Sequence, residues 1–141
     1  MKSLRRFVSF AMSAALLAGC AALPPAAPEA RPVSDNSAVI ALMDSARHDI
    51  AGGKPDSAVA SLERALRIEP RNPLLWQELA RLRLQQGQYQ QAEGLAARSN
   101  AWAGSDKALR AQNWRLIGES RLKRGDQAGA QAAFDAAAQT N

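Results

Sequence analysis

Apolar and small residues recur at helical spacing along most of the chain after residue 36. The pattern is clearest over residues 72–92, where Trp76 and Leu79 fall on one face of a helix. Asn72 can cap that helix, and the proline that follows it suits the first helical position, where a missing N–H costs nothing. Gly87 is a typical helix stop. The stretch therefore predicts a helix, a tight turn and the start of a second helix.

The same frame occurs three times. Corresponding positions are Leu42, Trp76 and Trp114; Ala46, Ala80 and Gly118; Gly53, Gly87 and Gly125; Ala58, Ala92 and Ala130; Leu62, Ala96 and Phe134; and Ala65, Ser99 and Ala137. The offset is 34 residues and then 38 residues. The four extra residues amount to about one helical turn. We therefore expect the first helix of the third repeat to begin one turn early, with Ser105 or Asp106 as its cap.

Glycine, proline and cap residues divide the chain into six expected helices. These cover residues 37–51, 55–68, 73 to the stop at Gly87, 89–100, 106–124 and 127–139. Residues 100–106 are expected to form a loop that contains Trp102. High alanine, leucine, glutamine and arginine content, with only 5% aromatic residues, also favours helices over sheet.

This frame resembles the tetratricopeptide repeat, which has a 34-residue period. The resemblance implies an all-α fold in which about three helical hairpins stack as a short right-handed solenoid. The repeats would cover about residues 39–72, 73–106 and 107–141, within a domain at 37–141. One departure is that Arg83, with equivalents Asp49 and Arg121, replaces the usual aromatic residue of the frame. We expect Asp49 and Arg83 to pair between neighbouring repeats.

The N-terminus has the pattern of a secretory signal. Residues 1–6 are cationic, and residues 7–18 form an apolar run that is too short for the roughly 20 residues of a membrane span. The next tetrapeptide, Leu-Ala-Gly followed by Cys20, resembles the bacterial lipobox. That resemblance implies removal of residues 1–19, lipidation of Cys20 and, because Ala21 follows instead of aspartate, an anchor in the outer membrane. The alternative is an ordinary secretion signal followed by a buried or stray cysteine.

Residues 20–36 contain four prolines among alanines, a composition that favours extended, polyproline-like backbone. We interpret this segment as a tether. At about 3.1 Å per residue, some 15 residues reach roughly 45 Å from the membrane.

Charge and residue counts exclude several function classes. The formal charge is +5, but three of the 18 Lys and Arg residues belong to the expected signal, which leaves 15 against 13 acidic residues, a net +2. Such a dispersed balance does not favour nucleic acid. His48 is the single histidine, so His-based triads and multi-histidine metal sites are excluded. No glycine-rich phosphate loop follows a strand. We therefore expect neither an enzyme nor a cofactor.

The remaining candidate site is the concave surface that tetratricopeptide arrays build from their first helices. One row of equivalent positions is apolar, and the two rows beside it contain three arginines. The candidate groove residues are Ile50, Leu84 and Leu122; Arg47, Arg81 and Glu119; and Met43, Gln77 and Arg115. This pattern suits a protein segment with apolar anchors and some acid. Two alternatives are that the apolar row only packs helices together, and that the Trp102 loop is the binding surface.

The whole architecture, an anchor, a short tether and about three repeats, looks like that of the lipoprotein activators of class A penicillin-binding proteins. The resemblance implies a domain that faces the periplasm from the outer membrane and has an inner-membrane peptidoglycan synthase as its partner. The alternatives are a pilotin-like lipoprotein for secretin or type IV pilus assembly, and a structural scaffold of the cell envelope.

Overall fold

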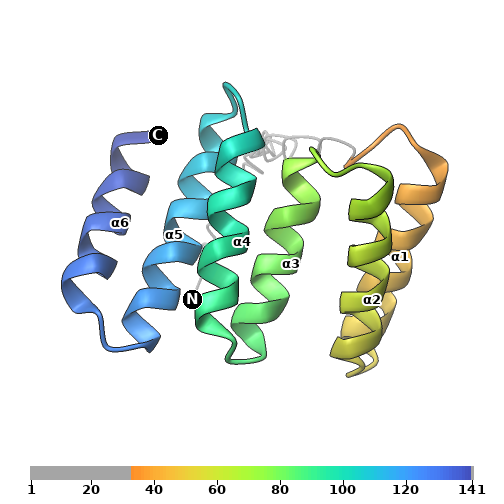
Figure 1. The fold of residues 1–141 in the computed structure, drawn as a ribbon, viewed down its shortest axis with the longest axis horizontal. Coiled ribbons are helices and arrows are strands. Elements are labelled where there is room, and N and C mark those ends of the chain that lie inside the picture. The colour runs from red at the N-terminus through yellow and green to blue at the C-terminus, as the bar shows by residue number, and fades with distance from the viewer. Residues whose placement is uncertain (1–32, 141) are drawn as a thin grey trace, which may run out of the picture. The chain divides into compact units, whose positions relative to one another are not determined.

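A computed structural model describes residues 33–140, which form three consecutive helical hairpins (Figure 1). The expected signal segment, Cys20 and the tether up to residue 32 lie outside the described residues. The helices are α1 (Ser37–Ala51), α2 (Pro55–Ile68), α3 (Pro73–Gln85), α4 (Tyr89–Trp102), α5 (Lys107–Lys123) and α6 (Gln127–Thr140). Each helix packs against the next one in the chain, and α3 also packs against α5. The described part of the chain contains no strand, so the all-α prediction is confirmed.

Local chemistry explains where the helices begin. The side chains of Asn36, Asn72 and Asp106 each accept a hydrogen bond at 3.0 Å from a backbone N–H in the first turn of α1, α3 and α5. Pro55 and Pro73 open α2 and α3. The expected start of α5, one turn early with Asp106 as its cap, is confirmed.

Equivalent glycines close the first helix of each hairpin. Gly53, Gly87 and Gly125 have φ angles of 69°, 76° and 83°, in the left-handed region. A side chain at Gly87 would meet little nearby, so the constraint there is the backbone conformation and not space. One predicted bound is wrong: α4 continues to Trp102, so the loop expected over residues 100–106 is shortened to residues 103–106.

The core consists of two clusters with different side-chain sizes. Larger residues of α1, α2 and α3, including Leu62, Leu75 and Met43, fill the first cluster. Smaller residues, including Ala80 and Ala96, contribute to the second cluster between α3 and α6. Small side chains allow helix axes to approach. Accordingly, Cα atoms of α3 and α5 come within 8 Å of one another, whereas those of α1 and α3 do not.

Gly118 shows how closely the last hairpin is packed. A Cβ atom at this position would lie 2.5 Å from Cε1 of Phe134 on α6. The phenyl ring therefore rests directly on the backbone of α5. This contact explains why the third repeat has glycine where the first two have alanine.

The first described residues are fastened to the connection between α2 and α3. The Val33 carbonyl accepts a hydrogen bond of 2.7 Å from Nδ2 of Asn72. The Ser34 hydroxyl donates to the carboxylate of Glu69. The Val33 side chain packs on the first core cluster. The chain therefore enters the domain beside the junction of the first two hairpins.

Candidate functional site

A buried polar network joins α3, α4 and α5. The Asn113 side chain is fully buried, and its Nδ2 donates to Ser99 Oγ at 2.7 Å and to Asn100 Oδ1 at 3.0 Å. Its Oδ1 accepts from Nε2 of Gln77 at 3.0 Å, and Ser99 Oγ donates to the Pro73 carbonyl at 2.7 Å. Serine thus replaces the usual small apolar residue of the repeat because it belongs to this network. The network fixes the relative positions of three helices.

A groove of about 380 Å³ lies over α3 and α5 beside this network. We call it the α3–α5 groove. It is lined by Arg81, Leu84, Gln85, Gln112, Arg115, Leu116 and Glu119. Arg81 Nη2 donates to Gln112 Oε1 at 3.3 Å, and the same oxygen accepts from Gln77 at 3.2 Å. The structure therefore brings four of the nine predicted groove residues together: Arg81, Leu84, Arg115 and Glu119.

The other five predicted residues do not line this groove. Met43 and Gln77 are each 3% exposed, so the placement of both in an open surface groove needs correction. Met43 belongs to the first core cluster. Gln77 is covered where α5 packs on α3, and its side chain donates a hydrogen bond to Asn113 on α5. Arg47, Ile50 and Leu122 are exposed elsewhere on the odd-numbered helices.

The expected ion pair between Asp49 and Arg83 is wrong. Arg83 instead lies 3.5 Å from Glu63 on α2, and its equivalent Arg121 lies 2.7 Å from Glu93 on α4. Each arginine reaches the second helix of the preceding hairpin. Asp49 is in the first hairpin, which has no preceding one among the described residues. The frame position that is usually aromatic therefore carries an inter-hairpin ion pair here.

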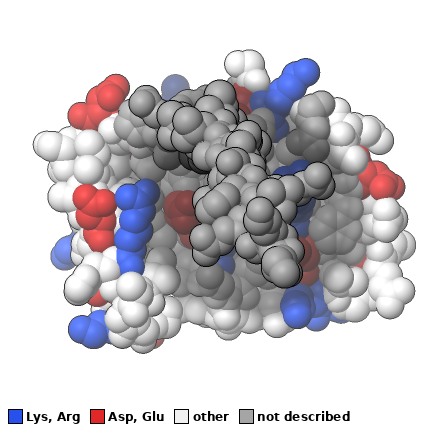
Figure 2. Space-filling model, turned by 180° about the vertical axis from the view of Figure 1, so that it is seen from behind, with Lys and Arg blue, Asp and Glu red and all other residues white. Residues whose placement is uncertain are grey.

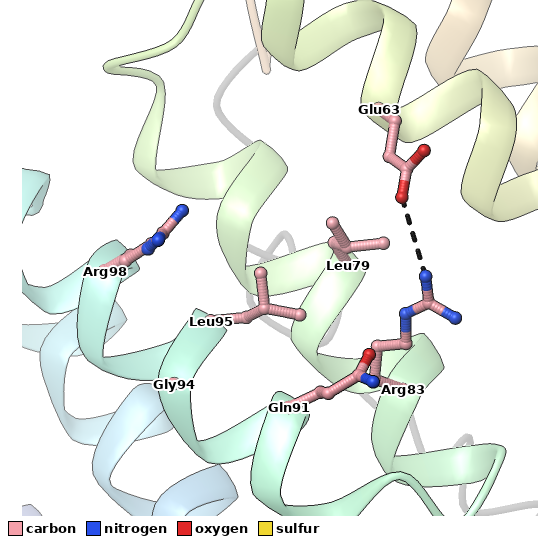
Figure 3. A pocket seen from close by; sticks show the side chains of 7 residues that line it. All are labelled: Glu63, Leu79, Arg83, Gln91, Gly94, Leu95 and Arg98. Carbon is pink, nitrogen blue, oxygen red and sulfur yellow. Dashed lines mark ion pairs between the residues drawn. The ribbon is translucent and has the colours of Figure 1, made fainter.

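A second groove, which the sequence pattern did not predict, lies between α2 and α4 with α3 as its floor (Figure 3). We call it the α2–α4 groove. It consists of two adjoining hollows of about 300 and 430 Å³ that share Glu63, Leu79 and Leu95. The Glu63–Arg83 ion pair borders the first hollow, to which Arg98 also contributes, and Arg67 and Trp76 line the second. A sequence signal that could have found it is a leucine close to an arginine on both α2 and α4. These residues are Leu66 and Arg67 on α2, and Leu95 and Arg98 on α4.

Trp102 lies at the end of α4 and not in a loop. Its side chain is 46% exposed, and the guanidinium of Arg71 sits 5.2 Å from the ring centroid. A cation over an aromatic face is a favourable contact of its own. This arrangement accounts for the exposed tryptophan without a ligand.

Charge is mixed over the visible surface. Figure 2 shows basic and acidic side chains interspersed with uncharged ones over the described part of the rear face. Within residues 33–140, no three His, Cys, Asp or Glu side chains cluster in a way that could hold a metal ion. None of the helices in the same range combines the length and apolar character needed to cross a membrane.

Comparison with known proteins places the chain in a family. The tetratricopeptide repeat family model matches residues 49–112. The globular C-terminal domain of LpoP from P. aeruginosa is 42% identical, with a TM-score of 0.71, and the match covers 74% of this chain and 98% of that domain. This chain belongs to the LpoP family of tetratricopeptide-repeat proteins.

A more distant match agrees in fold alone. The N-terminal domain of stress-induced protein-1 (STI-1) from C. elegans is 14% identical, with a TM-score of 0.70, and the match covers 74% of this chain and 87% of that domain. A comparison with curated proteins gave no match. The LpoP family and the repeat fold together indicate a domain for protein–protein interaction.

Proposed function

We propose that this chain is an outer-membrane lipoprotein, anchored through Cys20, that activates a class A penicillin-binding protein from the periplasm. The observation that carries the proposal is the 42% identity to the LpoP domain over 98% of that domain's length. The lipobox resemblance at Cys20 supports the anchor, and the resemblance of the whole architecture to lipoprotein activators supports the partner.

We propose the α3–α5 groove as the contact surface. Leu84 and Leu116 offer an apolar floor, while Arg81 and Arg115 offer guanidinium groups at its edge. Arginine binds carboxylates with good geometry, so the groove suits a segment with apolar anchors and acidic neighbours. The buried network around Asn113 holds the groove in place before binding, which lowers the entropic cost of association.

Activation in this proposal needs no chemistry from the lipoprotein. A bound protein shifts its partner between states by as much as its affinities for those states differ. A tenfold shift toward the active state requires a difference of about 1.4 kcal/mol. That amount is within the range of a few buried apolar contacts and one charge-assisted hydrogen bond.

The test is a lipid II polymerisation assay with a purified class A synthase and the full chain. We expect the wild-type chain to stimulate glycan polymerisation, and Arg81→Glu or Leu84→Glu to reduce this stimulation strongly while the helical circular dichroism signal stays. Arg64→Glu is the matched control, because Arg64 is exposed on α2 and lines neither groove.

Two results would contradict the proposal in different ways. Full stimulation by both groove variants would place the contact elsewhere on the domain. No stimulation by the wild-type chain, together with loss of pili or secretin multimers when the gene is deleted, would favour the pilotin-like alternative.

A further inference from the structure

We propose that the α2–α4 groove is a second docking site, independent of the α3–α5 groove, for an acidic and apolar segment of a partner protein. The two grooves share no lining residue. The proposal rests on the apolar floor of the groove, the charge at its open part and the way the fold keeps it open.

The floor is apolar and continuous across the two hollows. Leu79 on α3 lies at its base, Leu66 on α2 flanks it, and Leu95 on α4 is half-buried opposite. Figure 3 shows the Leu79 and Leu95 side chains close together in the space between the helices. Trp76 is half-buried beside them. A ligand side chain of leucine size would cover this surface and gain from its burial.

The charges of the groove are unbalanced in a way that favours an acidic occupant. Glu63 neutralises Arg83, whose side chain is 18% exposed. Arg67 and Arg98 remain, and neither has a carboxylate within 4.0 Å among the described residues. An acidic segment lying along the groove would therefore meet one such guanidinium group in each hollow.

Arg98 is already positioned by the aromatic floor. Its guanidinium lies 5.1 Å from the ring centroid of Trp76. Stacking on tryptophan restricts the arginine side chain while leaving its N–H donors free at the ring edge. Less side-chain entropy is then lost when a carboxylate binds.

The groove is open because α2 and α4 both pack on α3, while no Cα atom of α2 comes within 8 Å of a Cα atom of α4. The residues that line this space differ from those of the next interval, between α4 and α6. There the positions equivalent to Arg67, Leu95 and Arg98 are Ala101, Ala133 and Ala136. The leucine and the two arginines are thus particular to the first interval and not a general property of the repeat.

A binding assay with a defined probe tests the proposal on the full chain. The probe is a fluorescein-labelled peptide of twelve residues in which two leucines, three positions apart, are flanked by glutamates, and binding is followed by fluorescence anisotropy. A second peptide has lysine in place of each glutamate. We expect the glutamate peptide to bind at least tenfold more tightly than the lysine peptide.

Matched variants locate the binding. Arg67→Glu combined with Arg98→Glu should weaken binding of the glutamate peptide at least tenfold, and Leu95→Gln should weaken this binding severalfold. Arg64→Glu makes the same charge change on an exposed part of α2, and Arg81→Glu makes it in the α3–α5 groove; each should change affinity less than twofold. Circular dichroism checks that every variant keeps its helices.

The proposal is overturned by any of four results. These are no preference for the glutamate peptide, equal weakening by Arg64→Glu, loss of binding in Arg81→Glu with binding retained in the double variant, and dimerisation of the free chain that the double variant abolishes. The last result, measured by analytical ultracentrifugation, would assign the groove to a second copy of the chain.

Discussion

Replacing Asn113 by alanine tests whether the buried polar network holds the second and third hairpins together. The side chain is fully buried and makes three hydrogen bonds, to Gln77, Ser99 and Asn100. Alanine removes all three bonds and leaves a small void. It also removes the side chain that links α5 to both α3 and α4.

The expected loss of stability follows from these bonds. Three intramolecular hydrogen bonds contribute about 1 kcal/mol each, or about 3 kcal/mol together. Alanine is a better helix former than asparagine by about 0.5 kcal/mol, which offsets part of the loss. Two former partners keep a second bond, Gln77 to Gln112 and Ser99 to the Pro73 carbonyl, so neither is left without any partner. We expect Asn113→Ala to lower the free energy of unfolding by about 2–4 kcal/mol.

Urea unfolding followed by far-ultraviolet circular dichroism measures this loss. The control is Asn100→Ala, because Asn100 is half-buried and gives up only its bond to Asn113; about 1 kcal/mol is expected. The double variant Asn113→Ala with Ser99→Ala should cost less than the sum of the single changes, because the two residues share one bond. The reasoning would be refuted if Asn113→Ala and Asn100→Ala lowered the free energy of unfolding equally. It would also be refuted if the double variant lost the full sum of the losses of its two single variants.

Three further changes probe packing, backbone and anchoring. Gly118→Ala pushes a methyl group into the Phe134 ring, so overpacking of about 1–3 kcal/mol should outweigh a helix-propensity gain of about 1 kcal/mol and lower the free energy of unfolding in urea. Gly94→Ala, which meets nothing within 4 Å, should raise the free energy of unfolding in the same measurement. Gly87→Ala forces alanine into a left-handed conformation (φ 76°) and should lower stability by about 1–2 kcal/mol in urea unfolding. Cys20→Ala should move the protein out of the membrane fraction on cell fractionation, and an unchanged distribution would argue against a lipid anchor.

The helix bounds were largely predictable because the chain marks them with residues of strong local preference. Asn72 with the proline after it, and Gly87, act through their own backbone and side-chain chemistry, which does not depend on tertiary contacts. The end of α4 carries a mark of the same kind, because Gly104 (φ 54°) follows the C-cap Ala103, but the prediction placed the stop earlier. Asn100 was expected to stop the helix, but its side chain is held by Asn113 and the helix continues to Trp102.

Side-chain partners across hairpins were much less predictable. Periodicity shows which face a residue is on but not the register between neighbouring helices. Arg83 therefore pairs with Glu63 and not with Asp49. Equivalent positions also have different neighbours: Gln77 is covered where α5 packs on α3, whereas Arg115 on α5 stays exposed. The α2–α4 groove was missed for the same reason, because its walls come from two helices, α2 and α4, that are not adjacent in the chain.

The fastening of Val33 and Ser34 to the α2–α3 connection decides how the domain carries mechanical load. A pull on the preceding segment acts first on the bonds to Asn72 and Glu69, which lie between the first two hairpins. Those bonds take the tension before it reaches the first turn of α1. Traction from the N-terminal side is thus delivered to the junction of the first two hairpins, and the first helix is shielded from being peeled away at its end.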